Sequence, residues 1–193
     1  NLRALREVAT RKRLRVHMDG ARLFNASVAS GVPARDFSAC VDSVTFSLSK
    51  GLCCPVGAML CGPADFISEA RRIRKAMGGG WRQAGYLAAA GIYALEHMVE
   101  RLAEDHVLAK RLAAGLARFP GLEVDPKGAE TNVVFLRVRH PMGPDRFLKG
   151  LEERGVRANA YTLDIVRFVT HRDVGPEDAE RALRAAEETL RGR

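Results

Sequence analysis

Aromatic residues are scarce in this sequence, and long apolar runs are absent. Only 6% of the 193 residues are Phe, Trp or Tyr, and no apolar run approaches the roughly 20 residues that a helix needs to span a bilayer. The first residues also lack the basic-then-apolar pattern of a secretory signal. We therefore expect a cytoplasmic protein with no membrane partner.

Cysteine is also rare, and its spacing argues against a disulfide framework and against a zinc site. Cys53 and Cys54 are adjacent and lack a CxxC partner or a nearby pair of histidines. Cys40 and Cys61 lie in apolar stretches, where reduced cysteine acts as a small hydrophobe. We expect no bound metal.

No aromatic-interleaved basic motif accompanies the positive charge. Lys and Arg number 31 against 23 Asp and Glu, which gives a net charge of +8. Such a balance can indicate nucleic-acid binding. However, Arg71, Arg74 and Lys75 repeat at helical spacing, which is typical of a solvated helix face. We expect no nucleic-acid partner, and a basic enzyme that takes up anionic ligands fits as well.

The apolar content of 47% is sufficient to fill a core, and the first 80 residues alternate short apolar strands with turns and helices. The chain begins at Asn1 with Leu2, Leu5 and Val8 already at helical spacing, so we expect a fragment of a longer protein. The alternation predicts an α/β layer with a mainly parallel sheet. The expected elements are strands at 15–18, 43–48 and 57–60, and helices at 21–30 and 64–77.

A different pattern follows Gly78-Gly79-Gly80. Residues 82–117 form a long helical stretch, interrupted near His97, and a small α+β unit comes after it. The unit is expected to contain strands at 122–124, 132–138 and 165–170, and helices at 145–154 and 177–190. We therefore predict two domains, 1–100 and 101–193, with the boundary between residues 95 and 105.

Asp19 is the first candidate for chemistry, because it follows a predicted strand and precedes Gly20 and a helix. In an open α/β sheet, ligands bind at the carboxyl ends of strands. A carboxylate placed there can pair with a cationic ligand group. The alternative, which the residues alone leave equally open, is that Asp19 caps the helix N-terminus.

Lys50 is the second candidate. The segment Ser47-Leu48-Ser49-Lys50-Gly51 carries two hydroxyls and a lysine from a strand into a turn. A lysine whose pKa is lowered can form an imine with a carbonyl ligand, and serine hydroxyls can donate to a phosphate. Taken alone, the segment would be better interpreted as an ordinary surface turn with a solvated lysine.

Five motifs in series make the pattern specific. In order they are 17–22 (HMDGAR), 47–52 (SLSKGL), 55–57 (PVG), 78–85 (GGGWRQAG) and 167–171 (RFVTH). This ordered set resembles the threonine aldolase branch of the fold-type I enzymes that use pyridoxal 5'-phosphate (PLP). The resemblance implies part of a large PLP-binding domain (1–100) with a mainly parallel sheet, and a small C-terminal α+β domain (101–193).

The resemblance also implies roles for individual residues. Lys50 matches the lysine that binds PLP covalently, and Asp19 matches the carboxylate paired with the pyridine nitrogen. Arg167 matches the residue that binds the α-carboxylate of the amino-acid substrate. The remaining cofactor-binding positions are Ala21 against the ring, Arg22 at the start of the helix, and Ser47.

Some features depart from the family pattern. Trp81 stands where the family often has a slimmer residue, Ala58 stands where a serine is common, and Cys53-Cys54 occupies a site usually filled by small residues. None of these changes removes a group that the chemistry needs. The family's phosphate loop and ring-stacking histidine do not occur in these residues. We therefore expect residues 1–193 alone to bind PLP weakly and to lack threonine cleavage.

The implied reaction is the retro-aldol cleavage of L-threonine and L-allo-threonine to glycine and acetaldehyde, in threonine catabolism and glycine biosynthesis. The implied assembly is a homodimer or a homotetramer. Two alternatives remain open at this point: a truncated, catalytically silent PLP-fold protein, and another fold-type I activity such as β-elimination.

Overall fold

The computed structural model describes residues 1–192. These form two compact units: unit 1 is Asn1–Arg101, and unit 2 comprises residues 102–192. Each unit is considered separately. No helix among the described residues is both long and apolar enough to cross a membrane. The chain passes between the units after helix α5, in the break that the sequence places near His97.

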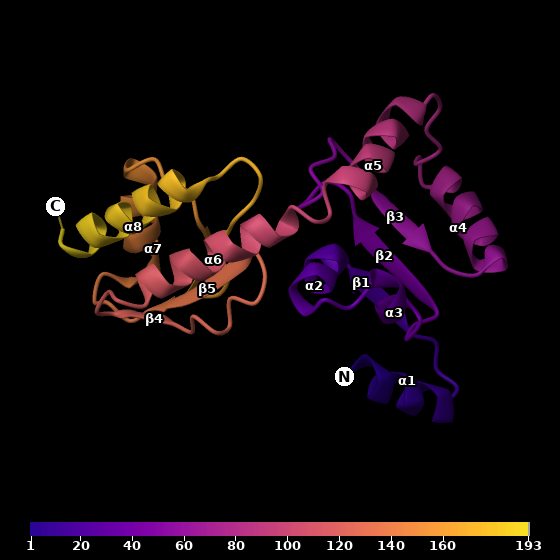
Figure 1. The fold of residues 1–193 in the computed structure, drawn as a ribbon, viewed down its shortest axis with the longest axis horizontal. Helices are drawn as coiled ribbons and strands as arrows, with labels where there is room; N and C mark the ends of the chain where they lie inside the picture. Colours follow the sequence, from indigo (N-terminus) through magenta and orange to yellow (C-terminus); the bar gives the residue numbers. More distant parts are fainter. Residues whose placement is uncertain (193) are drawn as a thin grey trace. The chain divides into compact units, whose positions relative to one another are not determined.

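Unit 1 contains a three-stranded sheet in the order β1-β2-β3 (Figure 1). β1 and β2 run parallel, whereas β2 and β3 run antiparallel. The α/β class is confirmed, and the parallel direction holds for one of these two pairings. Its elements are α1 (Leu2–Arg11), β1 (His17–Gly20), α2 (Leu23–Ser30), α3 (Ala34–Ser38), β2 (Ser43–Ser47), β3 (Ala58–Cys61), α4 (Ala64–Ala76) and α5 (Gly85–His97).

The two faces of this sheet differ because side chains alternate along a strand. Val44 is buried on one face, and Phe46 beside it meets Phe24 of α2 edge-on, with ring centroids 5.2 Å apart. Gly20 lies on this face too, and a Cβ there would stand 2.8 Å from the carbonyl oxygen of Thr45. The opposite face carries His17, Asp19 and the in-register residues of β2.

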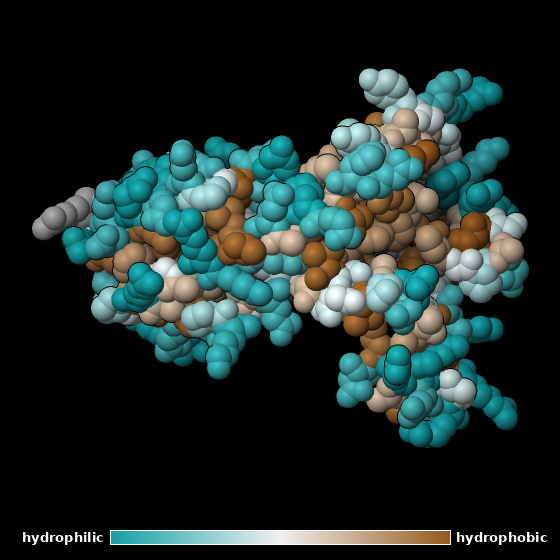
Figure 2. All heavy atoms as spheres, viewed as in Figure 1, coloured by the Kyte–Doolittle hydropathy of each residue, from teal (hydrophilic) through white to brown (hydrophobic). Residues whose placement is uncertain are grey.

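Unit 1 leaves much apolar surface open. Every residue of β3 is exposed, and α4 has no buried residue. Figure 2 shows apolar residues reaching the surface over β3 and α5. The large hydrophobic side chains exposed in these elements and the turn before α5 include Met59, Leu60, Phe66, Ile73, Met77, Trp81, Ile92 and Tyr93.

Unit 2 is an antiparallel sheet, in the order β4-β5-β7-β6, with helices on one face. The core lies between sheet and helices, where Phe147, Leu151, Leu136 and Val166 are almost fully buried. Its elements are α6 (Leu102–Leu116), β4 (Leu122–Val124), β5 (Val133–Val138), α7 (Gly143–Glu153), β6 (Asn159–Ala160), β7 (Ile165–Val169) and α8 (Pro176–Leu190).

Candidate functional site

The candidate site lies at the carboxyl ends of β1 and β2. Because these strands are parallel, both end at the same edge of the sheet, where open α/β sheets bind their ligands. Asp19 is next to last in β1 and pairs in register with Thr45, while Ser47 is the last residue of β2. Lys50 follows three residues later. The structure therefore brings Asp19, Ser47 and the Lys50 turn to one edge.

Asp19 is not the cap of the following helix. The N-cap position of α2 is Arg22, and no side chain there makes a capping hydrogen bond. Instead, Oδ1 of Asp19 accepts a hydrogen bond of 3.1 Å from the backbone N–H of Ala21. The side chain is exposed, and within residues 1–192 its second carboxylate oxygen has no hydrogen-bond or ion-pair partner. The capping alternative is therefore wrong, and the carboxylate is open to a ligand.

The loop that carries Lys50 is held by its own backbone. The N–H of Leu48 donates to the Gly57 carbonyl and the N–H of Cys54 donates to the Leu48 carbonyl, each at 3.0 Å. The N–H of Cys53 closes the turn on the Lys50 carbonyl at 2.9 Å. Leu52 is buried at 3% exposure, and burial of such a side chain stabilises by about 1.5–3 kcal/mol. The loop is therefore anchored on either side of Lys50.

The Lys50 side chain itself is exposed, and its amine makes no hydrogen bond or ion pair with any described residue. Ser47 and Ser49 are near Lys50 in the sequence, and their hydroxyl oxygens lie 3.5 Å from each other. Ala21 and Arg22 are half-buried at the start of α2. A primary amine, a carboxylate and two hydroxyls are thus available at one sheet edge. These groups suit a ligand that carries an aldehyde for the amine, a basic ring nitrogen for the carboxylate and a phosphate for the hydroxyls.

A polar network next to Asp19 on the same face of the sheet is not among the features predicted from the sequence. Nδ1 of His17 lies 2.8 Å from Oγ of Ser43, and Nε2 lies 3.2 Å from Oγ1 of Thr45. These residues share the face of Asp19, and Thr45 is its in-register neighbour. The alternation of Ser43, Thr45 and Ser47 with apolar residues was the signal that could have revealed this polar face.

Arg167 belongs to unit 2, on β7, and is half-buried. Its guanidinium carbon lies 5.9 Å from the ring centroid of Tyr161, and its Nε is buried with no hydrogen-bond partner in the described chain. Thr170, in the same motif, is structural: its hydroxyl donates to the Asp105 carbonyl at 2.7 Å. His171 is exposed and receives a hydrogen bond of 3.3 Å from the Asp173 N–H at Nδ1.

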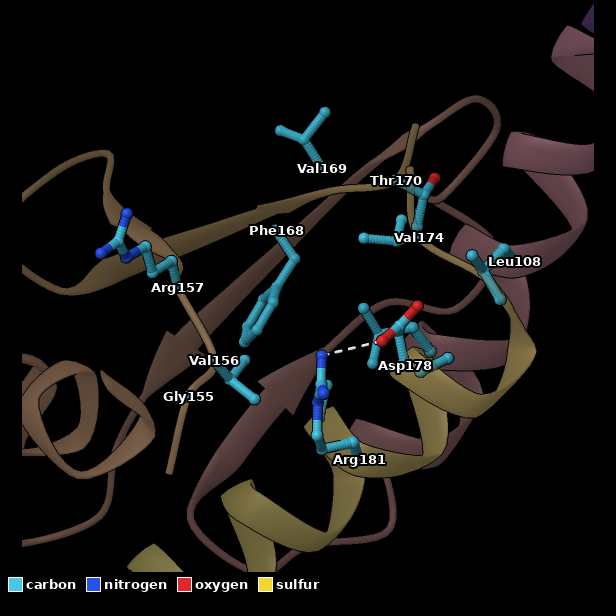
Figure 3. Close-up of a pocket in the computed structure, with 13 residues that line it drawn as sticks. Leu108, Gly155, Val156, Arg157, Phe168, Val169, Thr170, Val174, Asp178 and Arg181 are labelled. Carbon is cyan, nitrogen blue, oxygen red and sulfur yellow. Dashed lines mark hydrogen bonds and ion pairs between the residues drawn. The ribbon is translucent and has the colours of Figure 1, made fainter. Parts of the chain in front are cut away.

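A cavity of about 130 Å³ in unit 2 contains none of the sequence-predicted site residues (Figure 3). It lies on the helix side of β7, where Phe168 and Leu112 line it and Arg181 pairs with Asp178 at 2.8 Å. Ligand pockets usually measure 300–1,000 Å³, so we interpret this space as a packing gap. The described residues also contain no cluster of three or more metal-binding side chains.

Comparisons with known proteins identify relatives of this chain. A family model described as "Beta-eliminating lyase" matches residues 1–139. The Low-specificity L-threonine aldolase 1 of Arabidopsis thaliana is 38% identical over 186 residues, which cover 95% of this chain and 52% of that protein. The Low specificity L-threonine aldolase of Escherichia coli K12 is 45% identical over 173 residues, 89% of this chain and 50% of that protein.

Among solved structures, one from Listeria monocytogenes, described provisionally as an L-allo-threonine aldolase, superposes with a TM-score of 0.79 at 25% identity. The match covers 97% of this chain and 55% of that one. The chain therefore spans about half the length of the curated relatives and of the solved structure that it matches.

Proposed function

This chain belongs to the beta-eliminating lyase family, and on that premise we propose that it contributes the lysine site of a PLP-dependent aldolase. The proposed reaction is the cleavage of L-threonine and L-allo-threonine to glycine and acetaldehyde. The observation that carries the proposal is the meeting of Asp19, Ser47 and the Lys50 turn at the carboxyl edge of two parallel strands. The similarity to threonine aldolases of two organisms supports the choice of reaction.

In this proposal, each residue at this edge has a role suited to its chemistry. Lys50 would hold the cofactor covalently through its exposed amine, which pairs with no other residue among those described. Asp19 would accept a hydrogen bond from the protonated pyridine nitrogen and keep that nitrogen protonated. Ser47, Ala21 and Arg22 would complete the cofactor site. When bound, PLP supplies an electron-accepting ring that stabilises the negative charge left at Cα when the Cα–Cβ bond breaks.

Arg167 would bind the α-carboxylate of the substrate. A guanidinium presents two parallel N–H donors that match a carboxylate, which a lysine amine does not. Within the described chain the guanidinium of Arg167 forms no hydrogen bond or ion pair, which supports this role because its donors are not committed to another acceptor.

Borohydride reduction of the natural full-length protein tests the lysine assignment. Reduction should fix a pyridoxyl group on Lys50, which peptide mass spectrometry would locate. The variant Lys50→Ala should bind no PLP covalently and should release no acetaldehyde from allo-threonine. Lys75→Ala, which removes another exposed lysine of unit 1, is the matched control and should behave as the parent. Recovery of the adduct on Lys75 or Lys110 would refute the assignment.

β-Elimination is the second candidate, and the description of the matching family model favours it. The two reactions give different products from one substrate. Aldol cleavage of allo-threonine yields acetaldehyde and glycine, whereas elimination yields ammonia and a 2-keto acid. Detection of ammonia without acetaldehyde would select the second candidate.

Further parts of the proposal concern the whole protein. We propose that residues 1–100 belong to the large PLP-binding domain and residues 101–193 to the small C-terminal domain. We also propose a homodimer or homotetramer in the cytoplasm, acting in threonine catabolism and glycine formation. Light scattering of the natural protein would test the assembly, and a monomer would contradict it.

A further inference from the structure

The sheet of unit 2 has a face turned away from its helices, and Arg167 lies near its centre. Val166 and Phe168 point into the core on the helix side, so Arg167 points to the opposite face. In register, Arg167 stands between Phe135 of β5 and Asn159 of β6. Side chains directly opposite in neighbouring strands are close enough to contact one another.

Two aromatic rings border Arg167 on this face. Tyr161 begins the turn from β6 to β7, where its N–H donates to the Ile165 carbonyl at 2.7 Å. Its ring centroid is 4.9 Å from that of Phe135, so a ring from β5 and a ring from the turn after β6 meet across β7. The guanidinium of Arg167 lies over the Tyr161 ring at 5.9 Å. Both rings are about half exposed, at 58% for Tyr161 and 45% for Phe135.

In this arrangement Arg167 contacts an aromatic ring and pairs with no carboxylate of the described residues. It has no carboxylate partner within the described chain, and its Nε is buried without an acceptor. A stacked ring restrains the plane of a guanidinium and occupies none of its N–H donors. The donors therefore remain available for an incoming carboxylate.

We propose that Tyr161, supported by Phe135, is a positioning residue for Arg167. The Tyr161 ring holds the guanidinium in one orientation, and Arg167 then binds the α-carboxylate of an amino-acid substrate without first losing rotamer freedom. The inference rests on the function proposed for Arg167. Tyr161 itself touches no reacting atom, so its effect is on substrate affinity and not on the chemical step.

The test compares KM and kcat for allo-threonine in the natural full-length protein. Tyr161→Leu removes the ring but keeps an apolar side chain, and it should raise KM about three- to fivefold with kcat nearly unchanged. Tyr161→Phe retains the ring and should restore KM to within about twofold of the parent. Leu163→Ala is the matched control, because Leu163 lies in the same turn at 97% exposure, and it should leave KM unchanged.

Arg167→Ala separates this inference from the proposed function. It should raise KM about tenfold or more, and Tyr161→Leu added to it should have no further effect. Glycine affinity, measured by calorimetry, should follow the same order. If Arg167→Ala leaves KM and glycine affinity unchanged, the function proposed for Arg167 fails. If Arg167→Ala raises KM but Tyr161→Leu does not, or if Tyr161→Phe is as impaired as Tyr161→Leu, the positioning role alone is overturned.

Discussion

Asp19 is the residue on which the cofactor assignment depends most after Lys50. One of its carboxylate oxygens accepts the Ala21 N–H, and the other has no partner among residues 1–192. Asp19→Asn keeps the shape and the hydrogen bond but removes the charge. We expect weaker retention of PLP and a fall in turnover of about 100-fold or more, since a positioned electrostatic partner at a reacting centre contributes about 3 kcal/mol or more.

The measurements are the PLP content after dialysis and kcat for allo-threonine. Asp36→Asn is a matched control, because Asp36 lies in α3, outside the candidate site. Its PLP content and turnover should equal those of the parent. Near-normal turnover in Asp19→Asn would show that the charge is dispensable and would remove Asp19 from the site.

The pKa of Asp42 leads us to predict that the folding stability of unit 1 falls in acid. The backbone N–H of Val16 and the guanidinium of Arg6 each donate to its Oδ2 at 2.8 Å, and together they lower the pKa of Asp42 from 3.8 to about 2. Because the folded pKa lies below the unfolded one, the stabilisation is complete above about pH 4 and is lost as the pH falls through about 2.

Asp42→Asn should therefore lower the midpoint of thermal unfolding at pH 7, and the difference from the parent should shrink steadily as the pH falls through about 2. Circular dichroism during heating, at a series of pH values, measures both midpoints. A difference that stays constant down to pH 2 would mean that the charge of Asp42 is not its cause.

At the scale of elements, α7 and α8 pack through a close approach at Gly150. A Cβ at this position would lie 2.4 Å from Cγ2 and 2.8 Å from Oγ1 of Thr189, which is buried on α8. Gly150→Ala should cost about 1–3 kcal/mol through overpacking, offset by about 1 kcal/mol of helix propensity. We expect a net loss of up to about 2 kcal/mol in urea denaturation.

A second substitution should restore the stability that Gly150→Ala loses. Thr189→Ala removes both clashing atoms, so the double variant should recover much of the stability that Gly150→Ala loses. Gly85→Ala, at a helical position with open space around it, should be neutral or slightly stabilising. An additive loss in the double variant would show that contact with Thr189 is not what requires glycine.

At the scale of the whole molecule, the two units differ in how completely they bury their cores. The main cluster of buried hydrophobic residues lies within unit 2. Unit 1 leaves β3 and α4 exposed, with Leu60, Phe66 and Ile73 at the surface. β3 is also an edge strand, and unpaired apolar edges promote association.

We therefore predict that residues 102–193, expressed alone, form a soluble monomer with a cooperative unfolding transition. Residues 1–101 alone should self-associate and should bind a hydrophobic dye more strongly. Size-exclusion chromatography with light scattering and dye fluorescence measure the two properties. If the fragment 1–101 is monodisperse and does not bind the dye, its exposed apolar surface does not cause self-association and the prediction is wrong.

The types and order of the longer elements followed from local sequence alone. Apolar spacing and breakers such as Gly31 and Pro63 correctly predicted α2 and α4, and the interruption near His97 matches the gap between α5 and α6. Local signals suffice there because helix periodicity and turn residues act over a few positions. Motif order likewise indicated the family, which the matched family model confirms.

Tertiary structure decided what depends on partners distant in the sequence. Pairing with β2 places β1 at His17–Gly20 and not at 15–18, and β3 runs antiparallel to β2. The local pattern does not predict β6 or α3. Cross-strand register places Thr45 beside Asp19, and turn geometry places the Tyr161 ring against Arg167. The Asp19 oxygen that has no partner among residues 1–192 is likewise a result of the local fold. A single sequence does not encode register locally, because it is set by hydrogen bonds and packing between strands that meet only in the folded chain.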